Sequence, residues 1–142
     1  DNFFNKFARM ANISPALPLI GGGKTLFQPV YVANIAQAIE ACLAKDESKG
    51  QIYELGGVRT YSFKQIFKYI LSLTGKKRFL LSIPFGVASF IGKVAGFFPR
   101  PILTCDQVKL LKYNNTVNPL AKTFSHLGIT PTAVETIAPE YL

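Results

Sequence analysis

The sequence predicts an α/β fold with few, short strands and a helix-rich second half. Segments with the alternation typical of strands are interleaved with segments whose apolar residues recur at helical spacing. Helix-start signals, in which Ser, Thr or Asn is followed three residues later by Gln or Glu, recur along the chain. The 142 residues are 49% hydrophobic and only 17% charged. This composition suits one folded domain and excludes a disordered segment.

The first half begins with a predicted helix that Asn2 caps and Pro15 ends. An extended stretch, 17–20, follows it. The glycine run Gly21–Gly23 is predicted to form a hairpin turn. It resembles a phosphate-binding loop only superficially, because Leu26–Pro29 is not the helix start that such a loop requires.

A strand–helix–strand pattern comes next. Pro29–Val32 has the pattern of a short buried strand, and Asn34 with Gln37 is predicted to cap the following helix. The predicted inward stripe of this helix comprises Ile35, Ala38, Ile39, Cys42 and Leu43. Gln51–Leu55 alternates as a strand does and stops at Gly56–Gly57.

Helices dominate the second half. Three pairs have the capping-box spacing and are predicted to open helices: Ser62 with Gln65, Thr104 with Gln107, and Thr132 with Glu135. Phe79–Ile83 is predicted as a strand, and Pro84 suits the first turn of the helix after it. A short helix is expected from Asn118 to Gly128.

The segment from Phe79 to Phe98 has 20 residues and a single charge, Lys93, which is about the length of a membrane span. Pro84 splits this run and three glycines dilute it. After the proline, five apolar residues fall on one helical side: Val87, Phe90, Ile91, Val94 and Phe98. We therefore prefer a helix that packs on the core or on a partner, then a membrane-surface helix, and a span last.

The chain is basic, with 16 Lys and Arg against 8 Asp and Glu and a net charge of +8. Such a surplus favours an anionic partner: lipid head groups, an acidic protein face or nucleic acid. The densest basic cluster, Lys76-Lys77-Arg78, is the predicted contact with an anionic surface. Nucleic acid is not expected, because no helix carries a basic run and no nucleic-acid-binding motif is present. A basic lipid- or RNA-binding module remains an alternative.

Residues suited to catalysis or metal binding are sparse. His126 is the only histidine, and Cys42 and Cys105 have no metal-ligand spacing around them. Two cysteines are too few for a disulfide scaffold and indicate a reducing compartment. The Gly-x-Gly-x-x-Gly fingerprint of dinucleotide binding is absent from the sequence. We predict no catalytic, metal-binding or cofactor-binding residue in this chain.

Several segments resemble a known superfamily. Gln28–Ile39 resembles a strand-to-helix junction late in extended and atypical short-chain dehydrogenase/reductases, and Gly50–Gly57 resembles the strand after it. Tyr61–Gln65 resembles the opening of the next helix. Three further segments resemble the NAD(P)-dependent epimerase/dehydratase-like proteins of the 39 kDa complex I subunit type: Phe3–Ala8, Leu103–Leu111 and Pro139–Leu142.

The resemblance implies that this chain is the C-terminal, substrate-side portion of a Rossmann-like fold. Residues 1–60 would hold the last sheet-associated strands and a helix, and 61–142 a mostly helical region. A dinucleotide-binding half, absent here, would precede Asp1 and be the partner of this portion. That half would bind NADP or NAD in the full-length parent, and this chain alone would bind neither.

For function, the resemblance implies an accessory protein of complex I with a role in stability or assembly and little or no catalysis. It would be cytoplasmic, at the cytoplasmic face of a bacterial inner membrane, or on the mitochondrial matrix side. The alternative is an active oxidoreductase or epimerase/dehydratase whose Tyr-x-x-x-Lys lies upstream. Phe27 stands where sugar-nucleotide enzymes usually carry an arginine, which disfavours such a substrate. The predicted substrate- or partner-facing residues are Asn5, Arg9, Phe27, Gln28, Phe90 and Lys93.

Overall fold

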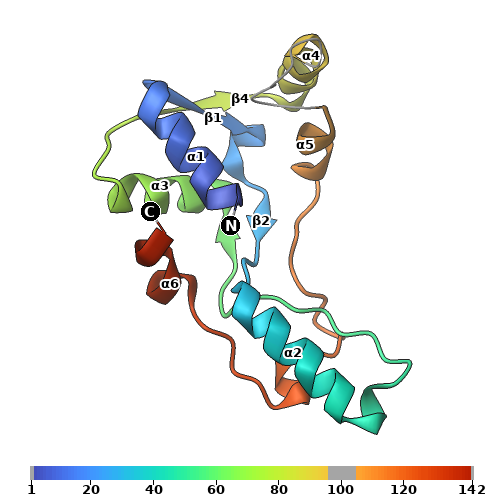
Figure 1. Cartoon of the computed structure of the whole chain (residues 1–142). Helices are drawn as coiled ribbons and strands as arrows, with labels where there is room; N and C mark the ends of the chain where they lie inside the picture. The colour runs from blue at the N-terminus through green and yellow to red at the C-terminus, as the bar shows by residue number, and fades with distance from the viewer. Residues whose placement is uncertain (1, 96–104, 142) are drawn as a thin grey trace. The chain divides into compact units, whose positions relative to one another are not determined.

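A computed structural model describes residues 2–95 and 105–141 of the chain, which form two compact units (Figure 1). Within the described residues, unit 1 contains the segments up to Leu26 and Tyr61–Asn114, and unit 2 contains Phe27–Thr60 and Asn115–Tyr141. The chain crosses between the units after residues 26, 60 and 114. Both halves of the sequence therefore contribute to both units.

The sheet of unit 1 is small and parallel. Strand β1 (Ala16–Ile20) pairs with β4 (Phe79–Ile83) from Ala16 opposite Phe79 to Ile20 opposite Ile83. Both strands lie where the sequence predicts extended structure. Leu17 and Leu19 are buried, because every second residue of a strand faces the same side of its sheet.

An aromatic cluster joins two helices of unit 1, α1 (Asn2–Ile13) and α3 (Phe63–Leu73). The ring of Phe7 contacts the rings of Phe63 and Phe67 edge-on, with centroids 5.4 and 4.7 Å apart. Phe63 and Phe67 are fully buried and one helical turn apart. Burial of such large side chains is the main stabilising contribution available to a unit of this size.

The capping box predicted for α3 is confirmed. The backbone N–H of Gln65 donates to the Ser62 hydroxyl at 3.2 Å, and the Gln65 side chain accepts from the backbone N–H of Ser62 at 2.7 Å. The helix ends in a Schellman motif, in which Gly75 has φ +66° and the N–H of Lys76 donates to the Leu71 carbonyl at 3.1 Å. Local sequence signals thus fix both ends of this helix.

The hairpin predicted at Gly21–Gly23 is wrong. The three glycines form a short 3-10 turn with φ between +60° and +70°, but β2 (Leu26–Phe27) pairs with β3 (Tyr61–Ser62) and not with β1. The Thr25 hydroxyl donates to the Leu111 carbonyl, and the Thr25 carbonyl accepts from the N–H of Phe63 at 2.9 Å. These long-range bonds fix the direction in which the chain leaves the turn.

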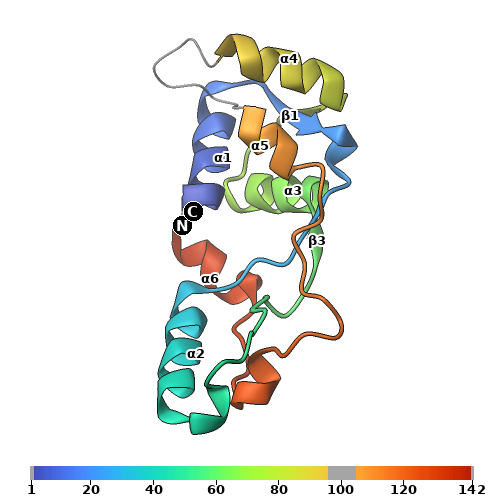
Figure 2. The same cartoon turned by 90° about the vertical axis from the view of Figure 1, so that its right-hand side faces the viewer.

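The apolar run from Phe79 to Phe98 is divided between a strand and a separate helix, α4 (Phe85–Ala95), which begins after Pro84 as predicted. Figure 2 shows α4 beside α5 (Cys105–Leu110). Two small residues of α4, Ala88 and Gly92, are buried. Over residues 2–95 and 105–141, no helix has the length and apolar character needed to cross a bilayer. Thr104 and Phe98 lie outside the described residues.

Unit 2 is built around α2 (Val32–Ala44), with the 3-10 turns η2 (Asp46–Ser48) and η3 (Phe124–Leu127) and helix α6 (Val134–Tyr141). The buried centre comprises Ala38, Phe124 and Leu127. The partly buried residues packed against it are Val30, Ile35, Ala41, Cys42, Tyr53, Leu55 and Ile129. Unit 2 therefore has a core of its own, formed by segments more than 80 residues apart in sequence.

Two predictions for α2 are wrong. The helix already begins at Val32, so Pro29–Val32 is not a strand and Asn34 lies inside the first turn instead of capping it. Ile39 and Leu43 are exposed, although Ala38 is buried and Ile35 and Cys42 are partly buried as the stripe predicts. The helix is apolar on more than one side, so its spacing alone does not identify the buried face.

The remaining elements of unit 2 are shorter than predicted. Gln51–Leu55 forms a single bridge, between Tyr53 and Lys122, because no described segment pairs with it along its length. The helix expected from Asn118 is only η3, although it ends at Gly128, with φ +76°, as predicted. Helix α6 begins at Val134, so the residue directly before it is Ala133. Thr132, the predicted cap, lies one residue too early.

Candidate functional site

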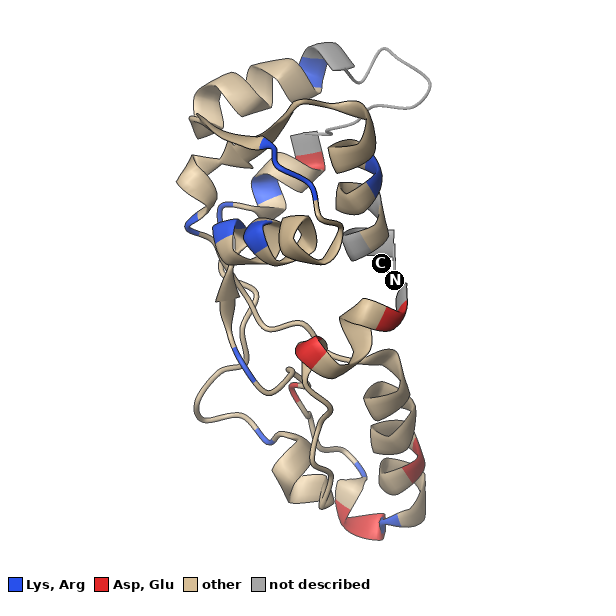
Figure 3. Ribbon diagram, turned by 90° about the vertical axis from the view of Figure 1, so that its left-hand side faces the viewer, with Lys and Arg blue, Asp and Glu red and all other residues tan. Residues whose placement is uncertain are grey.

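Charge is divided unequally between the units. Unit 1 holds 12 of the 16 basic residues and 2 of the 8 acidic ones, which gives it a formal charge of +10. Unit 2 holds the other 4 basic and 6 acidic residues and carries −2. Figure 3 shows Lys and Arg concentrated in unit 1. The basic character of the sequence therefore belongs to unit 1, which attracts anionic partners.

Unit 1 also exposes large apolar side chains on β4 and α4. We call this group the apolar surface: Phe79, Leu81, Val87, Phe90 and Ile91, which are between 41% and 82% exposed. Phe79 and Leu81 alternate along β4 and so share one face of the sheet. Val87, Phe90 and Ile91 share one side of α4, while the buried Ala88 and Gly92 occupy another.

The predicted stripe on α4 is thus solvent-facing over the residues that the structure describes. The side chains of Val94 and Phe98, which were predicted to continue it, are outside that part. The sequence interpretation missed Phe79 and Leu81, because it assigned them only to a strand. The sequence held no signal for an exposed face, because Phe79, Leu80 and Leu81 are all apolar and do not alternate with polar residues.

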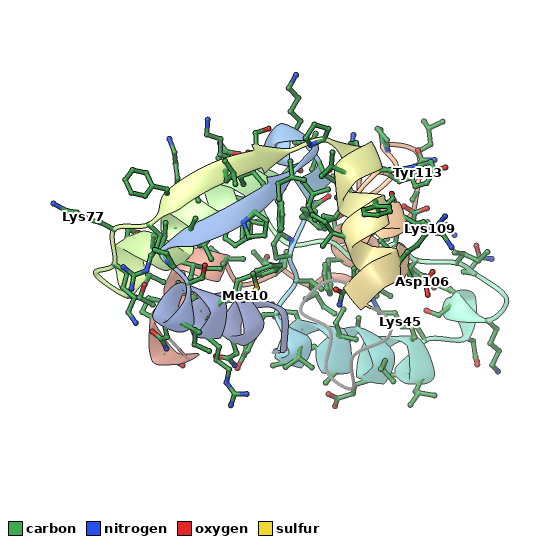
Figure 4. The ribbon with its side chains drawn as sticks, turned by 90° about the horizontal axis from the view of Figure 1, so that it is seen from above. Met10, Lys45, Lys77, Asp106, Lys109 and Tyr113 are labelled. Carbon is green, nitrogen blue, oxygen red and sulfur yellow. The ribbon has the colours of Figure 1, made fainter. Side chains whose placement is uncertain are left out.

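The basic cluster at residues 76–78 has two roles. Arg78 donates from Nε to the Ala11 carbonyl at 2.8 Å and from Nη1 to the Lys77 carbonyl at 3.1 Å. A cationic side chain at the carbonyl end of α1 stabilises that helix end, so Arg78 has a structural role. Lys76 is partly buried, whereas Lys77 is exposed and extends away from the end of β4 in Figure 4.

The structure divides the six predicted substrate- or partner-facing residues between the units. Asn5 and Arg9 lie on α1, and Phe90 and Lys93 lie on α4, all in unit 1. The other two residues, Phe27 and Gln28, belong to unit 2.

Gln28 links three segments of unit 2. Its side-chain Nε2 donates to the Gly57 carbonyl at 2.8 Å, and its Oε1 accepts from the backbone N–H of Val117 at 3.0 Å. Its backbone N–H donates to the Asn115 carbonyl at 3.0 Å. Both the donor and the acceptor of this side-chain amide form hydrogen bonds within unit 2, so Gln28 holds these segments together.

Residues that the sequence made candidates for chemistry have structural roles where the structure describes them. His126 accepts at Nδ1 from the backbone N–H of Thr123 at 3.0 Å and so closes the capping box of η3. Cys42 is a free thiol, partly buried against the core of unit 2. Within residues 2–95 and 105–141, no three His, Cys, Asp or Glu residues are grouped so as to hold a metal ion.

No family model matches the chain. Curated relatives do match it along its length. It is 31% identical to the Arabidopsis thaliana NADH dehydrogenase [ubiquinone] 1 alpha subcomplex subunit 9, mitochondrial, over 100% of the chain and 38% of that protein. It is 27% identical to the Neurospora crassa NADH-ubiquinone oxidoreductase 40 kDa subunit, mitochondrial, over 100% of the chain and 37% of the relative. The Mus musculus subunit 9 is 31% identical over 95% of the chain and 36% of its own length.

The chain is therefore homologous to a class of α/β proteins in the NAD(P)-dependent epimerase and short-chain dehydrogenase/reductase-like family. Its homologues within that family are the 39 to 40 kDa accessory subunits of NADH:ubiquinone oxidoreductase, complex I, which confirms the resemblance seen in the sequence. The chain spans less than two fifths of the length of these relatives.

Proposed function

We propose that the polypeptide to which this chain belongs is an accessory subunit of complex I, with a role in assembly or stability and little or no catalysis. The observation that carries this proposal is homology over the whole chain to complex I subunits of a plant and a fungus. Further support comes from His126, the only histidine, whose ring serves as a helix cap. The polypeptide would act on the mitochondrial matrix side or at the cytoplasmic face of a bacterial inner membrane.

Deletion of the parent gene tests this role. Loss of a subunit needed for assembly or stability lowers the amount of intact complex, so the band of assembled complex I on a native gel should weaken. Re-expression of the full-length parent should restore the band. An unchanged amount of fully active complex I in the deletion strain would contradict the proposal.

NADP or NAD, in this proposal, is bound by a dinucleotide-binding half of the parent and not by this chain. The glycine turn Gly21–Gly23 leads into β2, whereas a pyrophosphate is held where a glycine loop opens a helix. This turn therefore lacks the helix start that holds a pyrophosphate, which supports the proposal that the chain alone binds neither dinucleotide. That half would also be the partner of this portion within the parent.

The cofactor proposal predicts that the 142-residue chain binds NADPH or NADH with no better than roughly millimolar affinity. Isothermal titration calorimetry with each dinucleotide measures this affinity, and the full-length parent is the positive control. A micromolar dissociation constant for the chain alone would contradict the proposal that a separate half of the parent binds the dinucleotide.

A further inference from the structure

We propose that unit 1 docks on an anionic phospholipid bilayer, with the apolar surface entering the head-group region and lysines next to it contacting the lipid phosphates. This inference goes beyond membership of complex I and does not depend on it. It rests on three observations: the exposure of the apolar surface, the charge of the unit, and the places of Lys77 and Lys93.

The apolar surface is too exposed to be explained as the edge of a core. Phe79 is 82% exposed and Phe90 69%, and both present an aromatic ring to solvent. Its residues come from one face of β4 and from one side of α4, whereas the small residues Ala88 and Gly92 occupy the buried side of α4. Exposed apolar patches of this kind on soluble proteins mark a surface that something else covers.

Lysines accompany this surface at both ends of its sequence. Lys77 is two residues before Phe79, Lys93 is two residues after Ile91, and both are exposed. Long basic side chains beside aromatic and aliphatic ones are typical of membrane-surface elements, because the stem stays in the apolar layer while the ammonium group reaches the phosphates.

Charge and composition favour a lipid surface over an acidic protein. Unit 1 carries +10, and its one acidic side chain among the described residues, Asp106, is 3.1 Å from Lys109. Protein interfaces are depleted in lysine, whereas each lysine near an anionic leaflet strengthens binding. Many lysines in one unit with hardly any acid therefore match the uniform negative charge of a bilayer.

A second exposed apolar stripe provides the contrast. Val32, Ile39 and Leu43 of α2 are exposed, but unit 2 carries −2, and Glu40 follows Ile39 directly. An anionic leaflet repels such a unit. This stripe is therefore not part of the proposal, and its residues serve as controls.

Co-sedimentation of the 142-residue chain with two kinds of vesicle tests the proposal: phosphatidylcholine alone, and phosphatidylcholine mixed with phosphatidylglycerol. We expect binding to the mixed vesicles only, with an affinity that falls as salt is added. The double variant Lys77→Glu, Lys93→Glu should lose at least about 20-fold in affinity, since each lysine contributes about fivefold. Phe90→Ser should lose about tenfold or more.

Matched control variants lie in unit 2. Lys49→Glu changes an exposed lysine that forms an ion pair with the exposed Asp46, and Leu43→Ser removes an apolar side chain that is 85% exposed. Neither should alter vesicle binding by more than about twofold, because salt largely screens an exposed charge that is distant from the membrane contact. Circular dichroism verifies that every variant is folded. If Phe90→Ser is not, Phe79→Ser replaces it, because that ring is even more exposed.

Three results would overturn the proposal. The first is equal binding to neutral and mixed vesicles. The second is an equal loss with the unit 2 controls, which would mean that net charge alone drives binding. The third is a chain that binds neither vesicle and elutes as an oligomer that Phe90→Glu converts to a monomer, since a second copy would then cover the apolar surface.

Discussion

Gly57→Ala is expected to unfold unit 2 or to lower its free energy of unfolding by at least about 3 kcal/mol. A Cβ at residue 57 would lie 1.8 Å from the backbone oxygen of Pro29. The clash is with main chain, so no side-chain rotation relieves it. The same residue accepts a hydrogen bond from Gln28 and donates one to it, so a displaced Gly57 also loses both bonds. Denaturant midpoints followed by circular dichroism measure the loss.

Gly50→Ala is the matched control for this change. Gly50 also lies in unit 2 and has φ +70°, but a Cβ there meets nothing within 4 Å. Its substitution should cost only the left-handed backbone strain, about 1–2 kcal/mol. If the two variants lose the same stability, the close approach of Gly57 to Pro29 is not a real feature of the fold.

Asn34→Leu is expected to destabilise unit 2 by about 1–3 kcal/mol, because a partly buried backbone N–H loses its acceptor. Asn34 is only 3% exposed. Its Oδ1 accepts from the backbone N–H of Thr132 at 2.8 Å, and its Nδ2 donates to Gln37 at 2.9 Å. Leucine has a similar volume but no acceptor, so the partly buried Thr132 N–H would lose its partner.

The control here is Gln37→Ala, which removes only the bond between the two side chains and should cost about 0.5 kcal/mol. Urea unfolding compares the two variants, and hydrogen exchange at the Thr132 amide distinguishes the cause. Faster exchange at Thr132 in Asn34→Leu is expected from the structure. Unchanged exchange there, with fraying at the start of α2 instead, would support the capping role that the sequence suggested.

Short-range sequence signals predicted the elements that depend on neighbouring residues. The Ser62 and Gln65 box at the start of α3 involves residues within one helical turn. The start of α4 after Pro84 belongs to the same class. In each case, the group that satisfies the backbone is encoded a few positions away, so the sequence determines the outcome locally.

Long-range partners explain most of the failures. The glycine turn was correctly placed, but the strand that pairs with β1 begins at Phe79, more than 50 residues beyond it. Asn34 has the spacing of a helix cap, yet its acceptor is used by Thr132, 98 residues later. A local pattern carries no information on which distant segment competes for the same atom. The interleaving of the two units also depends on contacts between distant segments, so the local patterns did not predict it.

The candidate surface was predicted in part. The charge, Lys77 and the apolar side of α4 were visible in the sequence, whereas the commitment of Arg78 to the end of α1 was not. The sequence places Phe79 in a strand but does not predict which side of the sheet its ring faces. Exposure in a two-stranded sheet depends on what covers each side. Only the tertiary structure shows that β4 exposes that ring.

Membership of complex I is the central claim, and co-purification tests it most directly. The full-length parent, tagged at its natural locus, would be isolated in mild detergent, and the NADH:ubiquinone oxidoreductase activity of the eluate would be measured beside its subunit composition. We expect the tagged polypeptide to elute with the intact complex and its activity, in an amount comparable to the other subunits. Recovery of the tagged polypeptide free of complex I subunits, with all the activity in the flow-through, would contradict the claim.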